Sequence, residues 1–301
     1  MKNFNDIYQK VYQENIGIEE NRKVYLKQSR KRTLLAIIIL TIITFIVLGS
    51  NLTFLLPFVI FSGIIILLMA LTYKSKDYQK DYKGKIITSL VNTYDENLHF
   101  DLTQSISSSI YNKAEFELYD RFHSNDYICG KINGIIPIQL GDIHTENVHT
   151  DSDGHTTYTT VFRGLFSEIT LPKNLLSTIK IRSDKGMLGK LLSNKTQVEM
   201  DSQQFEKYFD VFTTDKILAV RILTSDIMNY MIDFKLQNKV TFELTIKNRS
   251  MYLRIHCADM FEGSLSKNAL DFETLHKYYK FLNFMCELNE KIYNVIQEKD
   301  I

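Results

Sequence analysis

A long stretch without ionisable side chains constrains the fold of this chain of 301 residues more than any other feature. From Thr33 to Tyr73 the sequence contains no Asp, Glu, Lys, Arg or His. One helix over this stretch would be roughly 60 Å long, about twice the thickness of the hydrocarbon core of a bilayer. We therefore expect the stretch to fold back on itself as a pair of transmembrane helices.

Turn-forming residues mark the point where the stretch reverses. Gly49, Ser50 and Asn51 interrupt the Ile- and Leu-rich pattern, and Pro57 follows near the start of the second half. Glycine, serine and asparagine favour turns, and proline is tolerated in the first turn of a helix. The sequence thus predicts two spans, over residues 33–48 and 52–73.

Basic residues flank the stretch on both sides. The nearest ones are Arg30, Lys31 and Arg32 before it and Lys74 and Lys76 after it. Lysine and arginine beside a span are retained on the cytoplasmic side of a membrane. Two basic flanks require an even number of crossings, which agrees with the predicted turn. We expect a cell-membrane protein with two spans and with both termini in the cytoplasm.

Two other readings of the apolar stretch are a buried pair of core helices and a secretory signal peptide. Core helices would show polar residues on a period of 3.6, whereas this stretch is apolar all round. A signal peptide would begin close to Met1, but the first thirty-two residues are polar and highly charged. A transmembrane pair therefore fits the sequence better than either alternative.

The remainder of the chain divides into helical segments and a β-rich part. We expect a basic, amphipathic helical segment over residues 1–32, the spans over 33–73 and a juxtamembrane helical segment over 74–124. A cytoplasmic domain then occupies residues 125–301. The helical segments are indicated by apolar residues that recur every three or four positions, such as Ile7 and Val11 or Leu90 and Tyr94.

Alternating apolar residues predict the strands of the domain. Residues 136–140 and 158–162 alternate, and the polar stretch 149–155 between them predicts a hairpin connection. Further strands are expected at residues 178–182, 210–213 and 217–223. Residues 240–246 and 251–257 predict a hairpin that turns at 248–250.

Two helices are expected to accompany these strands. Thr224 or Ser225 can cap a helix that carries Met228 and Met231, and a long terminal stripe from Leu275 to Ile296 predicts a second helix. The fold class is therefore α+β: a mainly antiparallel β domain closed by a long C-terminal helix. A pleckstrin-homology-like barrel is one candidate for it.

Several segments resemble an uncharacterised bacterial membrane-protein family, domain of unknown function 3137. They are NDYICGKINGIIPIQLGDIHTE, TVFRGLF, FEKYFDVFTTDKILAVRILTSDIMNYMIDF and MFEGSL. Family-like positions include Gly130, Phe162, Gly164, Phe209, Asp215, Arg221 and Thr224. Ser225 stands where the family usually places a proline. The resemblance covers most of the chain and implies a membrane-anchored protein without an assigned activity or catalytic residues.

The densest group of potential metal ligands lies in the predicted hairpin connection. It contains His144, His149, Asp151, Asp153 and His155, with Glu146 among them. Imidazoles and carboxylates are ligands for divalent metals. However, the spacing matches neither the H-E-x-x-H helix nor an EF-hand loop, so a solvated hairpin tip is the simpler interpretation.

A second candidate site comprises Asp210, Asp215 and Arg221. Carboxylates at this spacing could serve acid–base chemistry if they met in a cleft. An aspartate beside a turn more commonly bonds to its own backbone, and an arginine on the next element pairs with it. The sequence therefore favours a structural role for all three.

The remaining features limit the function classes. The net charge of +1 gives no field that attracts nucleic acid, and Cys129, Cys257 and Cys286 lie too far apart for a metal or disulfide framework. We expect buried thiols in a reducing compartment and no cofactor.

Our leading hypothesis is a non-enzymatic, membrane-anchored interaction module. Its partners would be the lipid bilayer with its head groups and another protein, and a homo-oligomer is one arrangement. A metal-dependent hydrolase that uses loop 144–155 and a small oligomeric pore are the alternatives. At bilayer depth only Thr41, Thr44 and Ser62 offer polar groups, which favours an anchor over a pore.

Overall fold

The computed structural model describes residues 3–50, 52–73, 75–183 and 197–298. The chain divides into two compact units. Unit 1 comprises Met1–Ser89 and Glu262–Leu275, and unit 2 comprises Leu90–Phe261 and His276–Ile301. The segment Glu262–Leu275 therefore belongs to the same unit as the N-terminal helices.

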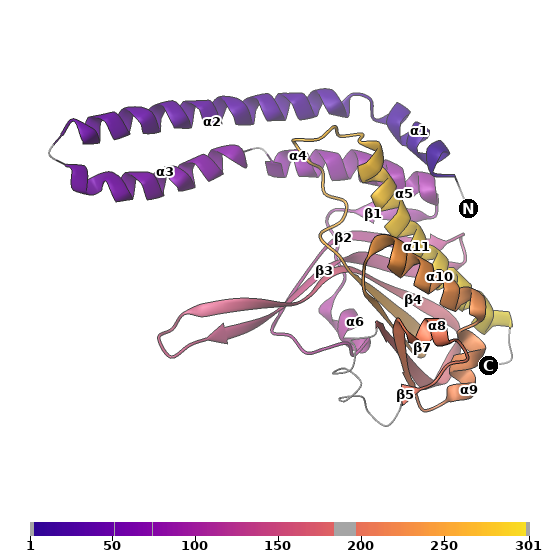
Figure 1. Cartoon of the computed structure of the whole chain (residues 1–301). Coiled ribbons are helices and arrows are strands. Elements are labelled where there is room, and N and C mark those ends of the chain that lie inside the picture. Colours follow the sequence, from indigo (N-terminus) through magenta and orange to yellow (C-terminus); the bar gives the residue numbers. More distant parts are fainter. Residues whose placement is uncertain (1–2, 51, 74, 184–196, 299–301) are drawn as a thin grey trace. The chain divides into compact units, whose positions relative to one another are not determined.

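Unit 1 is built from helices (Figure 1). They are α1 (Phe4–Glu14), α2 (Ile18–Leu48), the 3-10 turn η1 (Thr53–Leu55), α3 (Leu56–Leu71), α4 (Ser75–Tyr82) and the π-helical turn η2 (Lys83–Ile87). The helix α5 (Thr88–Tyr94) continues η2 into unit 2. In α1 the side chain of Asn3 accepts a hydrogen bond from the backbone N–H of Asn5, and Phe4, Ile7 and Val11 are buried as their spacing predicts.

Unit 2 contains an antiparallel sheet, which has seven strands in the described part of the chain. Its strands are β1 (Leu98–Asp101), β2 (Arg121–Ile132), β3 (Ile136–Thr150), β4 (Thr156–Ser183), β5 (Gln197–Val198), β6 (Phe209–Thr213) and β7 (Phe242–His256). The strand order is β1-β2-β3-β4-β6-β5, and β7 also pairs with β4. The long strand β4 is therefore the centre of the sheet.

Helices pack on the sheet. They are α6 (Ser108–Lys113), α8 (Gln203–Glu206), α9 (Lys216–Ile222), α10 (Ser225–Asn238) and α11 (Phe272–Glu298). Phe234 of α10 stacks on Phe284 of α11 with ring centroids 3.6 Å apart, and Phe284 lies 5.2 Å from Phe242 of β7. Around Tyr111 of α6, a second cluster contains Phe162 and Phe166 of β4.

The mixed α+β class, the antiparallel sheet and the long C-terminal helix are confirmed. The predicted hairpin connection at 149–155 is also confirmed, because β3 ends at Thr150 and β4 begins at Thr156. Thr224 caps α10 as expected: its hydroxyl accepts a hydrogen bond from the N–H of Ile227.

Two local predictions were wrong. Residues 217–223 do not form a strand, since Lys216–Ile222 is the helix α9 with Asp215 as its N-cap. Residues 240–257 are not a hairpin, because β7 runs without reversal from Phe242 to His256 and pairs with β4 on both sides of Asn248. Asn248 has a φ of 55°, so the turn-forming residue produces a local irregularity in the strand instead of a turn.

Candidate functional site

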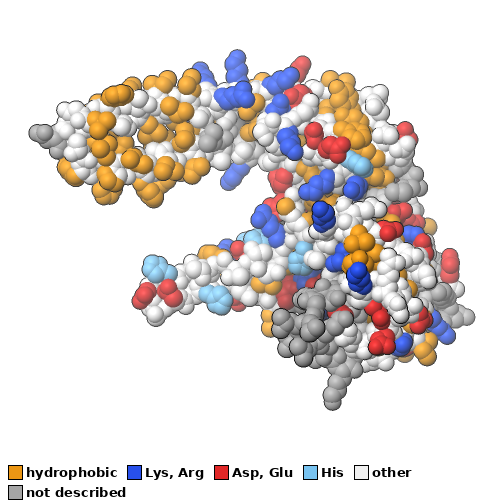
Figure 2. Space-filling model, viewed as in Figure 1, with side chains coloured by type: hydrophobic (Ala, Val, Ile, Leu, Met, Phe, Trp, Pro, Cys, Tyr) orange, Lys and Arg blue, Asp and Glu red, His pale blue; other side chains and the backbone are white. Residues whose placement is uncertain are grey.

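The most distinctive surface of unit 1 is the apolar part of α2 and α3, which lie side by side (Figure 1). Hydrophobic side chains cover it (Figure 2), and Phe45, Phe58, Phe61 and Met69 are each about 70% exposed (71%, 71%, 69% and 69%). Only 11% of the apolar window of α2 and 6% of the window within Thr53–Tyr94 is buried. By length and composition, α2 and the helical stretch Thr53–Tyr94 that contains α3 can cross a membrane. A core helix would be mostly buried, so the buried-pair alternative fits poorly.

Polar groups within this apolar pair are satisfied locally. The hydroxyls of Thr41 and Thr44 donate to the carbonyls of Ile37 and Leu40, each at 2.8 Å, and Ser62 bonds to its own helix. Between the helices, a Cβ added to Gly63 would meet Leu40 at 3.2 Å, so Gly63 permits close packing. Each of these hydroxyls therefore bonds to a carbonyl of its own helix, and the two helices pack closely at Gly63.

The basic flank lies beside the apolar surface. Arg30, Lys31, Arg32 and Lys76 are exposed, whereas Lys74 lies outside the described residues. The guanidinium carbon of Arg32 is 3.6 Å from the ring centroid of Tyr73, and the hydroxyl of Ser29 donates to the carbonyl of Ala70 at 3.2 Å. The middle of α2 and the end of α3 are therefore in contact next to the basic flank. Figure 2 shows Lys and Arg side chains gathered where the hydrophobic surface stops.

A distant segment fastens the helices of unit 1. In this segment, Glu262–Leu275, the backbone N–H of Gly263 donates to Oε1 of Gln79 at 2.8 Å, and the amide of Gln79 donates back to the carbonyl of Gly263. Lys83 pairs with Glu262, and Glu19 accepts from the N–H of Ala269 at 3.0 Å. A Cβ on Gly263 would lie 2.5 Å from the Tyr82 ring, so no larger residue fits.

Charge pairing also orders the start of α2. Arg22 donates to both carboxylate oxygens of Glu19, at 2.8 and 2.7 Å, and to the carbonyl of Leu265. The hydrogen bond from Arg22 lowers the pKa of Glu19, although burial opposes this shift. The N-terminal part of α2, the helix α4 and the turn η2 thus form one network of hydrogen bonds and ion pairs with the segment Glu262–Leu275.

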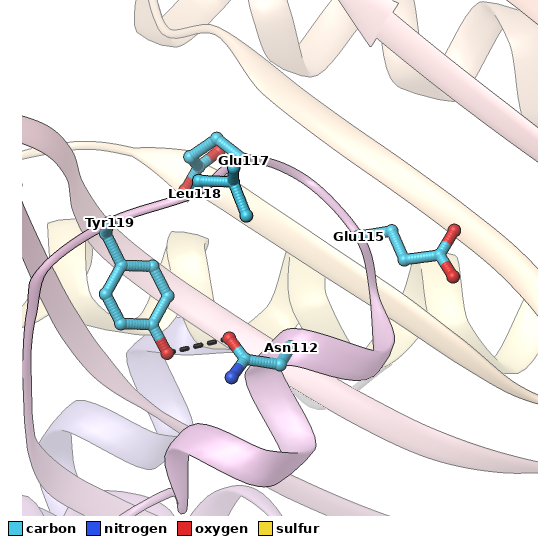
Figure 3. A pocket seen from close by; sticks show the side chains of 5 residues that line it. All are labelled: Asn112, Glu115, Glu117, Leu118 and Tyr119. Atoms are coloured by element: carbon cyan, nitrogen blue, oxygen red, sulfur yellow. Dashed lines mark hydrogen bonds between the residues drawn. The ribbon is translucent and has the colours of Figure 1, made fainter.

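Unit 2 has a surface recess on the loop between α6 and β2 (Figure 3). Its volume is about 490 Å³, and Asn112, Glu115, Glu117, Leu118 and Tyr119 line it. The hydroxyl of Tyr119 donates to Oδ1 of Asn112 at 2.7 Å across the recess. Leu118 is 92% exposed. The recess therefore combines carboxylates with an exposed apolar side chain.

Glu117 joins this recess to a buried charge network. It pairs with Arg254, which is 4% exposed and which also contacts Glu243 at 2.8 Å and the hydroxyl of Tyr111 at 2.8 Å. The guanidinium carbon lies 4.2 Å from the ring centroid of Phe116. Burial opposes the charge on Arg254, but Glu243, Tyr111 and Glu117 outweigh it and raise the pKa of the guanidinium. Every charge in this network has a partner, as a structural role requires.

The histidine-rich candidate site does not assemble around one point. Oδ1 of Asp151 accepts the N–H groups of Asp153 and His155 at 3.0 and 2.8 Å, which is a turn stabilised by its own aspartate. His144 instead lies 2.9 Å from the hydroxyl of Thr160. No group of three or more His, Cys, Asp or Glu among the described residues, which include His149, could hold a metal ion.

The structure places one histidine there that sequence reasoning missed. His123 of β2 lies opposite His144 of β3, with ring centroids 6.4 Å apart. Nε2 of His123 is 3.9 Å from Oε2 of Glu146, and Nε2 of His144 is 3.8 Å from Oε1 of the same carboxylate. Only the register of β2 on β3 brings these residues together, and spacing along the sequence does not reveal it.

The second candidate site is also distributed. Asp215 caps α9 by accepting a hydrogen bond from the N–H of Leu218 at 2.9 Å, and Asp210 accepts one from Gln197 at 2.9 Å. Arg221 is exposed in α9. Asp215 therefore has the structural role that the sequence favoured.

The family-like positions are mostly structural. Gly164 has a φ of 152°, and a Cβ there would lie 1.9 Å from the carbonyl oxygen of Ile255. Gly130 is similar, with 2.0 Å to the carbonyl oxygen of Asn97. Phe162 and Phe209 are buried. The two glycines permit close backbone contacts, and the two phenylalanines fill the core. None of the four supplies a reactive group.

These observations define the class of the protein as a mixed α+β chain with two exposed apolar helices. Residues 160–293 match the model of a family described as "Protein of unknown function (DUF3137)", which confirms the predicted resemblance over that segment. No curated protein matches the chain. A crystal structure of the mycobacterial trehalose monomycolate transport factor A, TtfA, is similar with a TM-score of 0.30 and 6% identity. The similarity covers 71% of this chain and 93% of that one. A likeness at this level carries no argument about fold or function.

Proposed function

We propose that this chain is a membrane-anchored interaction module. Helices α2 and α3 cross the cell membrane as a hairpin, and unit 2 binds a partner from the cytoplasmic side. The observation that carries the proposal is the exposure of the apolar side chains of α2 and α3, since such a surface is stable in lipid and not in water.

The basic flank supports the orientation of the hairpin. Exposed Arg30, Lys31 and Arg32 end one span, and exposed Lys76 follows the other. Cytoplasmic retention of such residues leaves both termini in the cytosol and the turn near Gly49 outside. The same residues can contact anionic lipid head groups, each at about 1 kcal/mol.

The architecture of unit 2 supports binding through a surface. Its β3–β4 ribbon extends beyond the rest of the sheet, and its recess presents the exposed Leu118 (Figures 1 and 3). The antiparallel sheet with α11 agrees with the coarse features of a pleckstrin-homology-like barrel, and that finer assignment stays a prediction. A protein partner is the leading expectation, with lipid head groups as the second.

Extraction from membranes tests the anchor. We expect the full chain to sediment with membranes, to resist alkaline carbonate and high salt, and to dissolve in detergent. Release by carbonate alone would contradict the proposal, because peripheral proteins are released in this way.

Reporter fusions test the orientation. A phosphatase that is active only outside the cytoplasm should be inactive after Ile301 and active when inserted between Ser50 and Asn51. A fluorescent protein that folds only in the cytoplasm should show the opposite pattern. Phosphatase activity at Ile301 would contradict the cytoplasmic assignment and leave the anchor itself intact.

A further inference from the structure

The β3–β4 ribbon continues past the sheet as a two-stranded arm, which we define as residues 147–160 (Figure 1). Pairing of β2 with β3 ends at Arg121 and Glu146, and pairing of β7 with β4 begins at Gly164. Residues 151–160 are all exposed, so neither face of the arm is buried there. An isolated two-stranded ribbon is at best marginally stable in water.

The outer edge of β4 in the arm has no strand partner among the described residues. Along 156–162 this strand pairs only with β3. On its other side, the nearest backbone hydrogen bond is the one that the N–H of Cys257 donates to the carbonyl of Arg163. The edge of β3 is better covered, because Asp120 accepts a hydrogen bond from the N–H of Val148 at 2.7 Å. The open edge of the arm is therefore on β4.

This edge lacks the features by which proteins usually block strand pairing. Residues 156–160 read TTYTT and contain no Lys, no Pro and no charge. They pair with β3 in regular register, because the irregularity of β4 lies beyond them, between Thr160 and Phe162. Threonine and tyrosine both favour strands. Exposed edges are normally protected by charges, prolines or bulges, so an unprotected edge of this composition is suited to pairing with another strand.

The sequence of the edge is also self-complementary. Residues 156–160, TTYTT, read identically in both directions. Antiparallel pairing of two copies centred on Tyr158 would place Tyr158 opposite Tyr158 and each threonine opposite a threonine. Aromatic pairs and Thr–Thr pairs are favourable across antiparallel strands, and no like charges meet. Arg121, whose guanidinium carbon is 4.7 Å from the Tyr158 ring centroid, holds that ring in place.

We propose that the arm pairs edge to edge with the arm of a second copy of this chain, about a two-fold axis at Tyr158. This pairing has the isologous symmetry of most homodimers. It deepens the proposed function, because it names the partner of the interaction module. Confinement of both copies to one membrane would raise their effective concentration and favour the pairing.

A charge exchange at the two-fold position tests the proposal. We expect the full chain in detergent to have the mass of a dimer by light scattering. Tyr158→Lys and Tyr158→Glu should each shift the mass to a monomer, because like charges would meet at the axis. A mixture of the two variants should restore the dimer, which also shows that both variants are folded.

Cross-linking gives an independent measurement of the register. With Cys129→Ser and Cys257→Ser as background, Tyr158→Cys should be joined by a short bismaleimide, because paired Cα atoms lie about 5.5 Å apart. Asp153→Cys is the matched control, because it is exposed on the same arm. Two copies of it would lie roughly 20 Å or more apart, and it should not be joined.

Three results would overturn the proposal: a monomeric wild-type chain, a dimer that persists in both Tyr158 variants, or equal cross-linking at positions 158 and 153. A monomeric wild-type chain would indicate that the open edge of β4 binds a strand of a different protein. Membrane extraction is measured separately on the same preparations, so loss of the anchor and loss of self-pairing are distinguishable.

Discussion

The apolar helices of unit 1 and the sheet of unit 2 use the same residue types in opposite ways. Phe58 in α3 is 71% exposed, whereas Phe166 in β4 is fully buried (0% exposed). Unit 2 buries most of its Ile, Leu and Phe between strands and helices, and the pair α2–α3 presents them outward. This difference is what the proposed membrane anchor predicts, because apolar side chains that face lipid do not need to be buried in a protein core.

The treatment of charge differs in the same way. Unit 2 buries Arg254 and Glu243 and gives each of them partners. The apolar stretch from Thr33 to Tyr73 has no ionisable residue at all. In the core of a protein in water, a buried charge is stabilised by a partner of opposite charge. A helix that faces lipid has no such partner, so ionisable residues are rare there.

The largest effect is expected for the buried charge of unit 2. Arg254→Met would leave Glu243 buried without its cation, and we expect a loss of about 3–5 kcal/mol in the free energy of unfolding. Hydrogen exchange of the β7 amides in detergent would measure it. Arg249→Met on the same strand is the control: Arg249 is exposed and donates one hydrogen bond to Leu171, so the cost should be about 1 kcal/mol. Equal losses would contradict the account.

A charge placed on an exposed apolar residue should be costly only in lipid. Ile64 in α3 is 54% exposed and Leu176 in β4 is 98% exposed. We expect Ile64→Lys to cost about 2.5–3.5 kcal/mol of membrane insertion and Leu176→Lys to cost almost nothing. The membrane-inserted fraction of each variant is the measurement. Full insertion of Ile64→Lys would mean that water surrounds the apolar pair.

Replacement of glycine by alanine tests the close contact between β4 and β7 in unit 2. Gly164→Ala would place a Cβ against the carbonyl oxygen of Ile255, in addition to backbone strain, and we expect a loss of about 3 kcal/mol. At Gly154 the φ of 83° is also unfavourable, but no atom lies within 4 Å of an added Cβ. Gly154→Ala should therefore cost about 1 kcal/mol. Thermal unfolding of both variants distinguishes contact from strain.

The smallest effect concerns an exposed ion pair near the recess. Hydrogen bonds from Lys247 and Lys180 lower the pKa of Glu115, so its contribution to stability is present above its ordinary pKa and is lost as the pH falls through the lowered value. The side chain is 51% exposed, so the gain is below about 1 kcal/mol. The stability difference between wild type and Glu115→Gln should vanish in acid.

Local signals predicted much of the fold. The charge-free stretch, the alternation in β3 and β4, the cap at Thr224 and the stripe of α11 each lie within a few residues of sequence. Short apolar segments were less informative. Residues 217–223 suit a strand or a helix equally well by pattern, and the cap from Asp215 decided for the helix. Asn248 suggested a turn, but pairing with β4 keeps β7 continuous.

Contacts between distant residues were not predictable. Arg254 is separated from Glu117 by 137 positions, and Gln79 from Gly263 by 184, so neither pattern nor propensity indicates these pairs. The same holds for His123 beside His144, which depends on strand register. The sequence of the histidine-rich loop suggested metal ligands, and the structure uses Asp151 to form a turn there.

Labelling of single cysteines in intact membranes tests the central claim most directly. Ile64→Cys and Leu176→Cys both occupy exposed positions in the structure. With Cys129→Ser and Cys257→Ser as background, inverted vesicles and a membrane-impermeant maleimide, we predict rapid labelling at position 176 and none at position 64 until a denaturing detergent unfolds the chain. Labelling of both positions at the same rate in intact vesicles would show that water surrounds α3, and would contradict the account.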